Sequence, residues 1–233
     1  MTLQVRGLVS GYGAGHVING LDLELAPGEI LAVMGRNGMG KTTLLRTLIG
    51  QATIVAGAIT LDGRSLIGLP GHEIARAGLG YVPQGRAIFN DLTVADNLRL
   101  GRFARTAASS SPADNTKMFP ILAERAGQRA GTLSGGEQQQ LAIARALAGE
   151  PRILLLDEPS EGIQPSIVET IGKLLRKLAD ERNIGVLLVE QQLDLTLDVA
   201  DCVVLLEKGK IRHAFTRNDL AVGTYQLTAE LGI

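Results

Sequence analysis

Short apolar runs alternate with segments of helical periodicity along most of the chain. The runs that predict strands are a pair within 21–35, on either side of Pro27-Gly28, and single runs at 78–83, 152–158 and 185–190. The run RILLLDE at 152–158 is unbroken, which is typical of a strand buried on both faces of a parallel sheet. This alternation predicts an α/β fold with a largely parallel sheet.

Other periodic segments predict helices and a hairpin. Residues 167–182, IVETIGKLLRKLADER, carry apolar side chains at helical spacing. Residues 43–50 continue a glycine-rich loop as a helix, which we expect to end at its terminal glycine. Residues 201–215 return to strand and predict a hairpin with its turn at 208–210.

One segment interrupts the pattern. Strand-like runs are absent from 85–132, where helical fragments occur instead at 93–104 and 118–127. The stretch TAASSSPADN at 106–115 separates these fragments and has the composition of a loop or a disordered segment. A helical insertion within the sheet fold is the simplest interpretation.

We therefore expect a single domain over residues 1–233. Its sheet core would comprise 1–84 and 151–233, and 85–150 would form an inserted α-helical subdomain. The chain contains no internal repeat, so we expect it to hold one copy of each functional element rather than two.

Composition narrows the class of protein. The 23 Lys and Arg residues nearly balance 24 Asp and Glu residues, so the chain has no polybasic footprint, and we expect no nucleic-acid partner. A single cysteine excludes an intrachain disulfide and favours a reducing compartment. The first residues lack the pattern of a signal peptide, and no apolar run reaches membrane-spanning length. We therefore expect a cytoplasmic chain.

The strongest chemical signal is GRNGMGKTT at 35–43. It matches G-x-x-x-x-G-K-[ST], follows an apolar strand and opens a helix, which is the context this phosphate-binding loop requires. Glycines allow backbone N–H groups to surround phosphate oxygens, and the helix N-terminus adds favourable partial charge. Lys41 should reach the β- and γ-phosphates, and the Thr42 hydroxyl should bind Mg²⁺. A nucleoside triphosphate is the expected ligand.

Two carboxylates follow the buried strand at 152–158. Asp157 is placed to hold Mg²⁺, as the acidic residue on the second strand of P-loop enzymes does. Glu158 is placed to position and deprotonate an attacking water. Beside a phosphate-binding loop, this pair predicts hydrolysis of the nucleotide.

A second helix start of anion-binding type occurs in TLSGGEQQQLAIARAL at 132–147. Together with the two preceding motifs, LSGGE resembles the signature of the nucleotide-binding subunit of ABC transporters, and the resemblance covers nearly the whole chain. It implies a P-loop NTPase of ABC type, with antiparallel β strands in a mixed sheet core and an inserted helical subdomain. It also implies an ATPase that uses ATP and Mg²⁺.

The resemblance explains why one chain has two such sites. In this family two subunits pair head to tail, and the Ser-Gly-Gly helix start of one caps the γ-phosphate held by the other. The expected partners are thus a second ATPase subunit, paralogous or identical, permease subunits that hold the chain at the inner face of the membrane, and indirectly a periplasmic solute-binding protein. The residues expected to contact nucleotide are Tyr12, Gly35, Asn37, Gly38, Gly40, Lys41, Thr42 and Thr43 of one subunit and Ser134, Gly135 and Gly136 of its mate.

Further positions correspond to family motifs. Tyr12 lies where the family stacks an aromatic ring on adenine, although a loop tyrosine also serves structure alone. Gln84 follows the strand at 78–83 and corresponds to the glutamine that touches Mg²⁺ and the attacking water. The catalytic set expected from the resemblance is Glu158, Lys41, Gln84 and Gln191, and the metal set is Thr42, Gln84 and Asp157.

Two positions depart from the family pattern. Gln191 replaces the histidine that usually contacts the γ-phosphate. An amide can donate a hydrogen bond, but it cannot become positively charged or transfer a proton. Gln164 replaces an aspartate that usually crosses the dimer interface. We expect a role for Gln191 in sensing the γ-phosphate, and no acid–base role.

The motifs leave the solute open. GRNGMGKTT, YVPQGRAIF, QRAGTLSGGEQQ and VEQ are similar to the second ATPase subunit of branched-chain amino acid importers, whereas EPSEGIQPS is more similar to the urea and short-amide branch of that group. The alternative class is a non-transport ABC ATPase of translation or DNA repair. Those proteins usually carry two such domains or basic inserts, which this sequence lacks.

Overall fold

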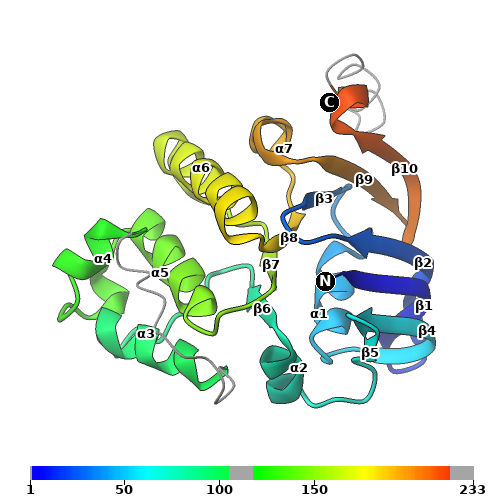
Figure 1. Ribbon diagram of the computed structural model, residues 1–233, viewed down its shortest axis with the longest axis horizontal. Helices are drawn as coiled ribbons and strands as arrows, with labels where there is room; N and C mark the ends of the chain where they lie inside the picture. Colours follow the sequence, from blue (N-terminus) through cyan, green and yellow to red (C-terminus); the bar gives the residue numbers. More distant parts are fainter. Residues whose placement is uncertain (1, 105–117, 221–233) are drawn as a thin grey trace.

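The computed structural model describes residues 2–104 and 118–220, and its elements form two sheets and two groups of helices (Figure 1). The loop expected at 106–115 lies outside the described residues. Within the described part, no helix is both long enough and apolar enough to cross a bilayer.

A six-stranded sheet forms the centre of the molecule, with the strand order β10-β9-β3-β8-β7-β6. Its strands are β3 (Ile30–Met34), β6 (Leu79–Val82), β7 (Ile153–Asp157), β8 (Gly185–Val189), β9 (Cys202–Glu207) and β10 (Lys210–Thr216). All pairs are parallel except β9 with β10, which form a hairpin. The predicted strands at 78–83, 152–158 and 185–190 and the predicted hairpin are confirmed.

A second, antiparallel sheet has the order β2-β1-β4-β5 and consists of β1 (Leu3–Tyr12), β2 (Gly15–Leu25), β4 (Thr53–Leu61) and β5 (Arg64–Ser65). The two strands predicted within 21–35 therefore belong to different sheets. The sequence pattern did not predict β1, β4 and β5. Irregular pairing after Val5 and Arg6 breaks the alternation of β1, and most of β4 is exposed, so neither strand has a clean period of two.

The helices follow the order of the chain. They are α1 (Lys41–Leu48), α2 (Gly71–Ala77), α3 (Val94–Gly101), α4 (Pro120–Glu124), α5 (Gly135–Leu147), α6 (Pro165–Arg182) and α7 (Leu193–Val199), with 3₁₀ turns at Arg102–Ala104 and Ala130–Thr132. The predictions at 43–50, 93–104, 118–127 and 167–182 are confirmed. The short helix α7 was missed because LDLTLDV alternates with a period of two.

The central sheet is packed on both faces. On one face, Leu44, Leu45 and Leu48 of α1 share a buried cluster with both sheets, so α1 lies between them. On the other face, α5 and α6 cover the sheet. Side chains of β7 alternate between the two clusters, with Leu154 and Leu156 on one face and Leu155 on the other, as expected for a strand buried on both sides.

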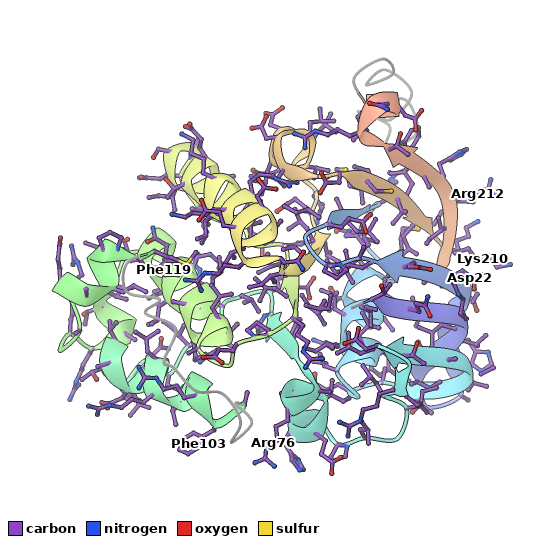
Figure 2. The ribbon with its side chains drawn as sticks, viewed as in Figure 1. Asp22, Arg76, Phe103, Phe119, Lys210 and Arg212 are labelled. Atoms are coloured by element: carbon purple, nitrogen blue, oxygen red, sulfur yellow. The ribbon has the colours of Figure 1, made fainter. Side chains whose placement is uncertain are left out.

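Helices α3, α4 and α5 gather at one side of the molecule, away from the antiparallel sheet (Figure 1). Phe119 is 2% exposed within this group, whereas Phe103 projects from its edge, as Figure 2 shows. Tight packing of α3 on α5 depends on Gly101, because a Cβ there would lie 2.1 Å from the carbonyl oxygen of Arg145.

Candidate active site

Four parallel strands direct their following loops to one edge of the central sheet. Val33 of β3 and Asp157 of β7 both lie beside Val189 of β8, and Val82 of β6 lies beside Leu156. Open α/β sheets bind ligands at this carboxyl edge. A pocket of about 420 Å³ opens there, lined by Val17, Asn37, Gly38, Gly40, Lys41, Thr42, Thr43, Gln84, Glu158, Glu161 and Gln191.

The loop between β3 and α1 forms one wall of the pocket. Gly40 precedes α1 with φ 107°, in the left-handed region, and a Cβ at this position would lie 3.1 Å from Cδ1 of Ile18. No side chain caps the start of α1, so its first N–H groups are available to an anion. The geometry suits a loop that wraps phosphate oxygens with backbone N–H groups.

Lys41 lies at the base of the pocket and is 5% exposed. Its Nζ donates to the carbonyl oxygen of Gly35 at 2.7 Å and of Arg36 at 3.4 Å, and lies 3.7 Å from Oε1 of Glu158. Two carbonyls and one carboxylate thus face the ammonium group. These contacts hold the Lys41 ammonium group at the pocket floor. A charged phosphate oxygen would form a stronger hydrogen bond with it than the carbonyl oxygens do.

The carboxylate of Asp157 is held by two hydroxyl groups. Thr42 Oγ1 donates to Oδ1 at 3.2 Å, and the Tyr81 hydroxyl donates to Oδ2 at 3.4 Å. Burial raises the pKa of Asp157, and the charge of Glu158 acts in the same direction. Burial likewise raises the pKa of Tyr81, followed by the charge of Asp157, so the phenol stays a donor.

The residues present suit Mg²⁺, which prefers oxygen ligands and usually takes one or two protein groups together with phosphate and water. Thr42 and Asp157, two of the three residues in the expected metal set, are in direct contact. Gln84, the third, is turned toward other carboxylates instead. Among the described residues no cluster of three or more histidine, cysteine or acidic side chains forms a self-sufficient metal site.

Glu158 lies at the centre of a network that no local pattern predicted. Its backbone has φ 49°, in the left-handed region, and its N–H donates to the carbonyl oxygen of Val189 at 2.9 Å. Strain of this kind often occurs at functional sites. The side chain is turned toward the pocket, where Lys41 Nζ faces one carboxylate oxygen and the amides of two glutamines face both.

The two glutamines join the carboxylate to opposite walls of the pocket. Gln191 Nε2 donates to Oε1 of Glu158 at 2.5 Å and to Oδ1 of Asn37 at 2.9 Å. Gln84 Nε2 donates to Oε2 of Glu158 at 3.3 Å and to Oε2 of Glu161 at 3.0 Å. The catalytic set named from the sequence is therefore brought together, with Glu158 in contact with the other three members.

Two pocket residues were missed by the sequence analysis. Glu161 contacts Gln84, and its place three residues after Glu158 in the SEG turn was the available signal. Val17 comes from β2 of the other sheet and packs against the Gly40 position, so nothing in its own neighbourhood indicated the site. Tyr12 does not line the pocket. It is 44% exposed, and its hydroxyl, through a hydrogen bond, raises the pKa of Arg46.

The second anion-type helix start lies outside this pocket. Ser134 is exposed and forms the N-cap of α5 in a capping box, in which Ser134 N–H donates to Oε2 of Glu137 at 2.8 Å and Glu137 N–H donates to Ser134 Oγ at 3.4 Å. None of Ser134, Gly135 and Gly136 lines the pocket. Gln164 also lies outside it, as the residue before α6.

Arg86 connects the loop after Gln84 to this helix start. Its Nη1 donates to Oε1 of Gln138 on α5 at 3.1 Å, and a Cβ at Gly135 would lie 3.1 Å from its Nη2. Arg86 thus joins the loop after Gln84 to the first turn of α5 by a side-chain contact.

Comparison with known proteins gives a consistent result. Residues 18–161, more than half of the chain, match the family model described as ABC transporter. The chain is 43% identical over 203 residues to the high-affinity branched-chain amino acid transport ATP-binding protein BraG of Pseudomonas aeruginosa, covering 86% of both chains. It is 35% identical to the probable branched-chain amino acid transport ATP-binding protein LivF of Archaeoglobus fulgidus, covering 94% of this chain and 93% of that one. A solved ATP-binding subunit of an ABC transporter superposes over 100% of both chains with TM-score 0.85 and 26% identity.

Proposed function

The chain belongs to the ABC transporter family and is the ATP-hydrolysing subunit of a transporter, and we propose that this transporter imports branched-chain amino acids. The observation that carries this proposal is the 43% identity to BraG over 86% of both chains. Urea and short amides are the second candidate solute class. They are supported by the segment EPSEGIQPS at 158–166, which is more similar to the urea and short-amide branch of this group of importers.

In the proposed reaction, the backbone N–H groups of 35–43 hold the ATP phosphates, and Tyr12 stacks on adenine. Lys41 neutralises the β- and γ-phosphate oxygens. ATP displaces Lys41 from the carbonyls of its own loop and separates it from Glu158, whose carboxylate then orients and deprotonates the attacking water. Gln191 senses the γ-phosphate through its amide while it holds Asn37.

Thr42 and Asp157 would hold Mg²⁺, with Gln84 joining them once its amide leaves Glu158 and Glu161. The ion would neutralise charge on the phosphate oxygens during hydrolysis. Rotation of the Gln84 amide, from donating to two carboxylates to offering its oxygen, is therefore a step that this chain itself performs.

We further propose that the ATP pocket is completed by a second ATPase subunit. The Ser134-Gly135-Gly136 turn lies outside the chain's own pocket. The capping box takes the N–H groups of Ser134 and Glu137, whereas the N–H groups of Gly135 and Gly136 have no acceptor within the helix and suit an anion. In a head-to-tail pair each turn would cap the γ-phosphate held by the mate. The importers that this chain resembles favour a paralogous mate, and the pair would bind permease subunits at the inner membrane face and act with a periplasmic solute-binding protein.

The proposal is tested by uptake in the native host. Replacing Lys41 with alanine in the chromosomal gene should abolish high-affinity uptake of radiolabelled leucine, with the matched change Lys173→Ala on the exposed face of α6 as control. Loss of labelled urea uptake with leucine uptake intact would assign the second solute class. Uptake of both solutes at the control level would refute both solute assignments.

A further inference from the structure

Glu190 is a buried carboxylate that the proposed reaction does not use. It follows β8 directly, is 2% exposed, and its N–H donates to the carbonyl oxygen of Val33 at 3.3 Å. Glutamate is almost never fully buried unless a partner group holds it. Its position between the end of β8 and Gln191 therefore calls for a physical reason.

One oxygen of Glu190 holds the following backbone. Oε1 accepts the N–H of Gln191 at 2.7 Å and the N–H of Gln192 at 3.0 Å. Gln192 is the N-cap residue of α7 and forms no side-chain cap of its own. The carboxylate thus satisfies two N–H groups at a helix start, where the helix supplies no internal acceptor. It fixes the conformation of the chain over 190–192.

The other oxygen has no comparable role. Oε2 is buried and has no hydrogen-bond partner within the described residues. An unsatisfied buried acceptor lowers the stability of the fold. If the only role of this side chain were to cap α7, a side chain with a single oxygen would be more stable here. Serine and threonine, each with a single side-chain oxygen, are common residues for capping a helix start. The long carboxylate is thus poorly explained by stability alone.

Its effect on the pocket is direct, because the backbone it fixes carries Gln191. The Gln191 amide bridges Asn37 in the loop before α1 and Glu158, the residue directly after β7. A side chain reaches two partners on different elements only if its Cα and backbone direction are held. We propose that Glu190 is a positioning residue that sets the Gln191 amide for the γ-phosphate, an inference that rests on the proposed ATPase site.

The first test measures the loop in the nucleotide-free protein. Hydrogen exchange of the amides of Gln191 and Gln192 should accelerate about tenfold in Glu190→Ala, since both lose their acceptor, and stay slow in Glu190→Gln, which keeps an oxygen in place. Glu181→Ala, on the exposed face of α6, is the matched control. Unchanged exchange in Glu190→Ala would overturn the proposal, whatever the protein does with nucleotide.

The second test separates positioning from general support of the fold. Glu190→Ala should weaken binding of an ATP analogue with a β,γ-imido bridge about tenfold and change ADP binding less than twofold, because only the former has a γ-phosphate for Gln191 to meet. Glu190→Gln should bind the ATP analogue and ADP with the same relative affinity as the wild type. Equal weakening of both nucleotides would mean that Glu190 only supports the fold, and would overturn the proposal.

A double-mutant cycle with Gln191→Ala completes the design. If Glu190 acts through Gln191, the double variant should bind the ATP analogue as tightly as Gln191→Ala alone. The amide that Glu190 is proposed to position is already absent from that single variant. Additive losses would overturn the proposal. A wild-type chain that binds neither nucleotide would refute the proposed function instead, and the exchange measurement would still decide whether Glu190 holds the loop.

Discussion

The ammonium group of Lys41 lies 3.7 Å from Oε1 of Glu158, across the pocket at the carboxyl edge of the central sheet. Both side chains are largely buried, with 5% and 12% of their surface exposed. The group proposed to hold phosphate and the group proposed to activate water therefore face each other in the same pocket. The two residues belong to different segments of the chain, so each contribution is separable by substitution.

Replacing Glu158 with glutamine should lower the rate of ATP hydrolysis at least about 100-fold, because the amide keeps the shape of the side chain and cannot accept a proton. ATP binding should persist, since Lys41 and the backbone of the phosphate-binding loop are unchanged. The variant should therefore accumulate as an ATP-dependent dimer on gel filtration. Glu181→Gln is the control, and a Glu158→Gln chain that binds ATP yet stays monomeric both alone and with its paralogous mate would contradict the paired site.

Replacing Lys41 with alanine should weaken ATP binding about 10- to 100-fold, the usual loss for a charge-assisted hydrogen bond. The buried pocket floor would lose its cation and leave Glu158 without a basic partner. Isothermal titration in the presence of Mg²⁺ measures the change. Lys173→Ala should bind as the wild type does, and an unaltered affinity in Lys41→Ala would show that the lysine does not meet phosphate.

Mixing two inactive variants should restore activity if the ATP site is shared between chains. Ser134→Arg would damage only the helix start presented to a mate, and Lys41→Ala only the chain's own pocket. In a homodimer of purified chains, equal amounts should recover about a quarter of wild-type turnover, since random pairing places half of the chains in mixed dimers with one intact site of two. Each variant alone should stay inactive, and a mixture no better than its components would argue against head-to-tail sharing.

The capping box of α5 should make stability depend on pH. Burial acts to raise the pKa of Glu137, but the N–H and hydroxyl of Ser134 and the charge of Arg125 together leave it below the ordinary value. A lowered pKa means that the folded state favours the charged form, so the stabilisation is present at neutral pH and is lost as the pH falls through the folded-state pKa.

Glu137→Gln should accordingly lower the free energy of unfolding by about 0.5–1 kcal/mol at pH 7, where the charge also favours the helix start. Urea unfolding curves recorded from pH 7 down to the acid range should show wild type and variant converging as the glutamate is protonated. A gap that stays constant over the whole range would mean that the charge contributes nothing to the cap.

The local pattern of apolar residues was sufficient to predict those elements whose burial follows from that pattern. The unbroken apolar runs of β7 and β8 require burial on both faces, and the helical spacing of 167–182 requires one covered face, so each pattern had one structural solution. The motif of the proposed phosphate-binding loop at 35–43 was visible for the same reason, because its glycines, lysine and threonine lie close together in the sequence. These features were accessible from the sequence alone.

Contacts between distant segments were decided only by the tertiary structure. The register of β3, β7 and β8 brings Asn37, Glu158 and Gln191 within hydrogen-bonding distance, and no period of two or 3.6 residues encodes that register. The same holds for Glu161 beside Gln84 and for Val17 at the pocket wall. Sequence periodicity indicates which face of an element is covered. Which side chains meet across the pocket depends on how the strands are paired.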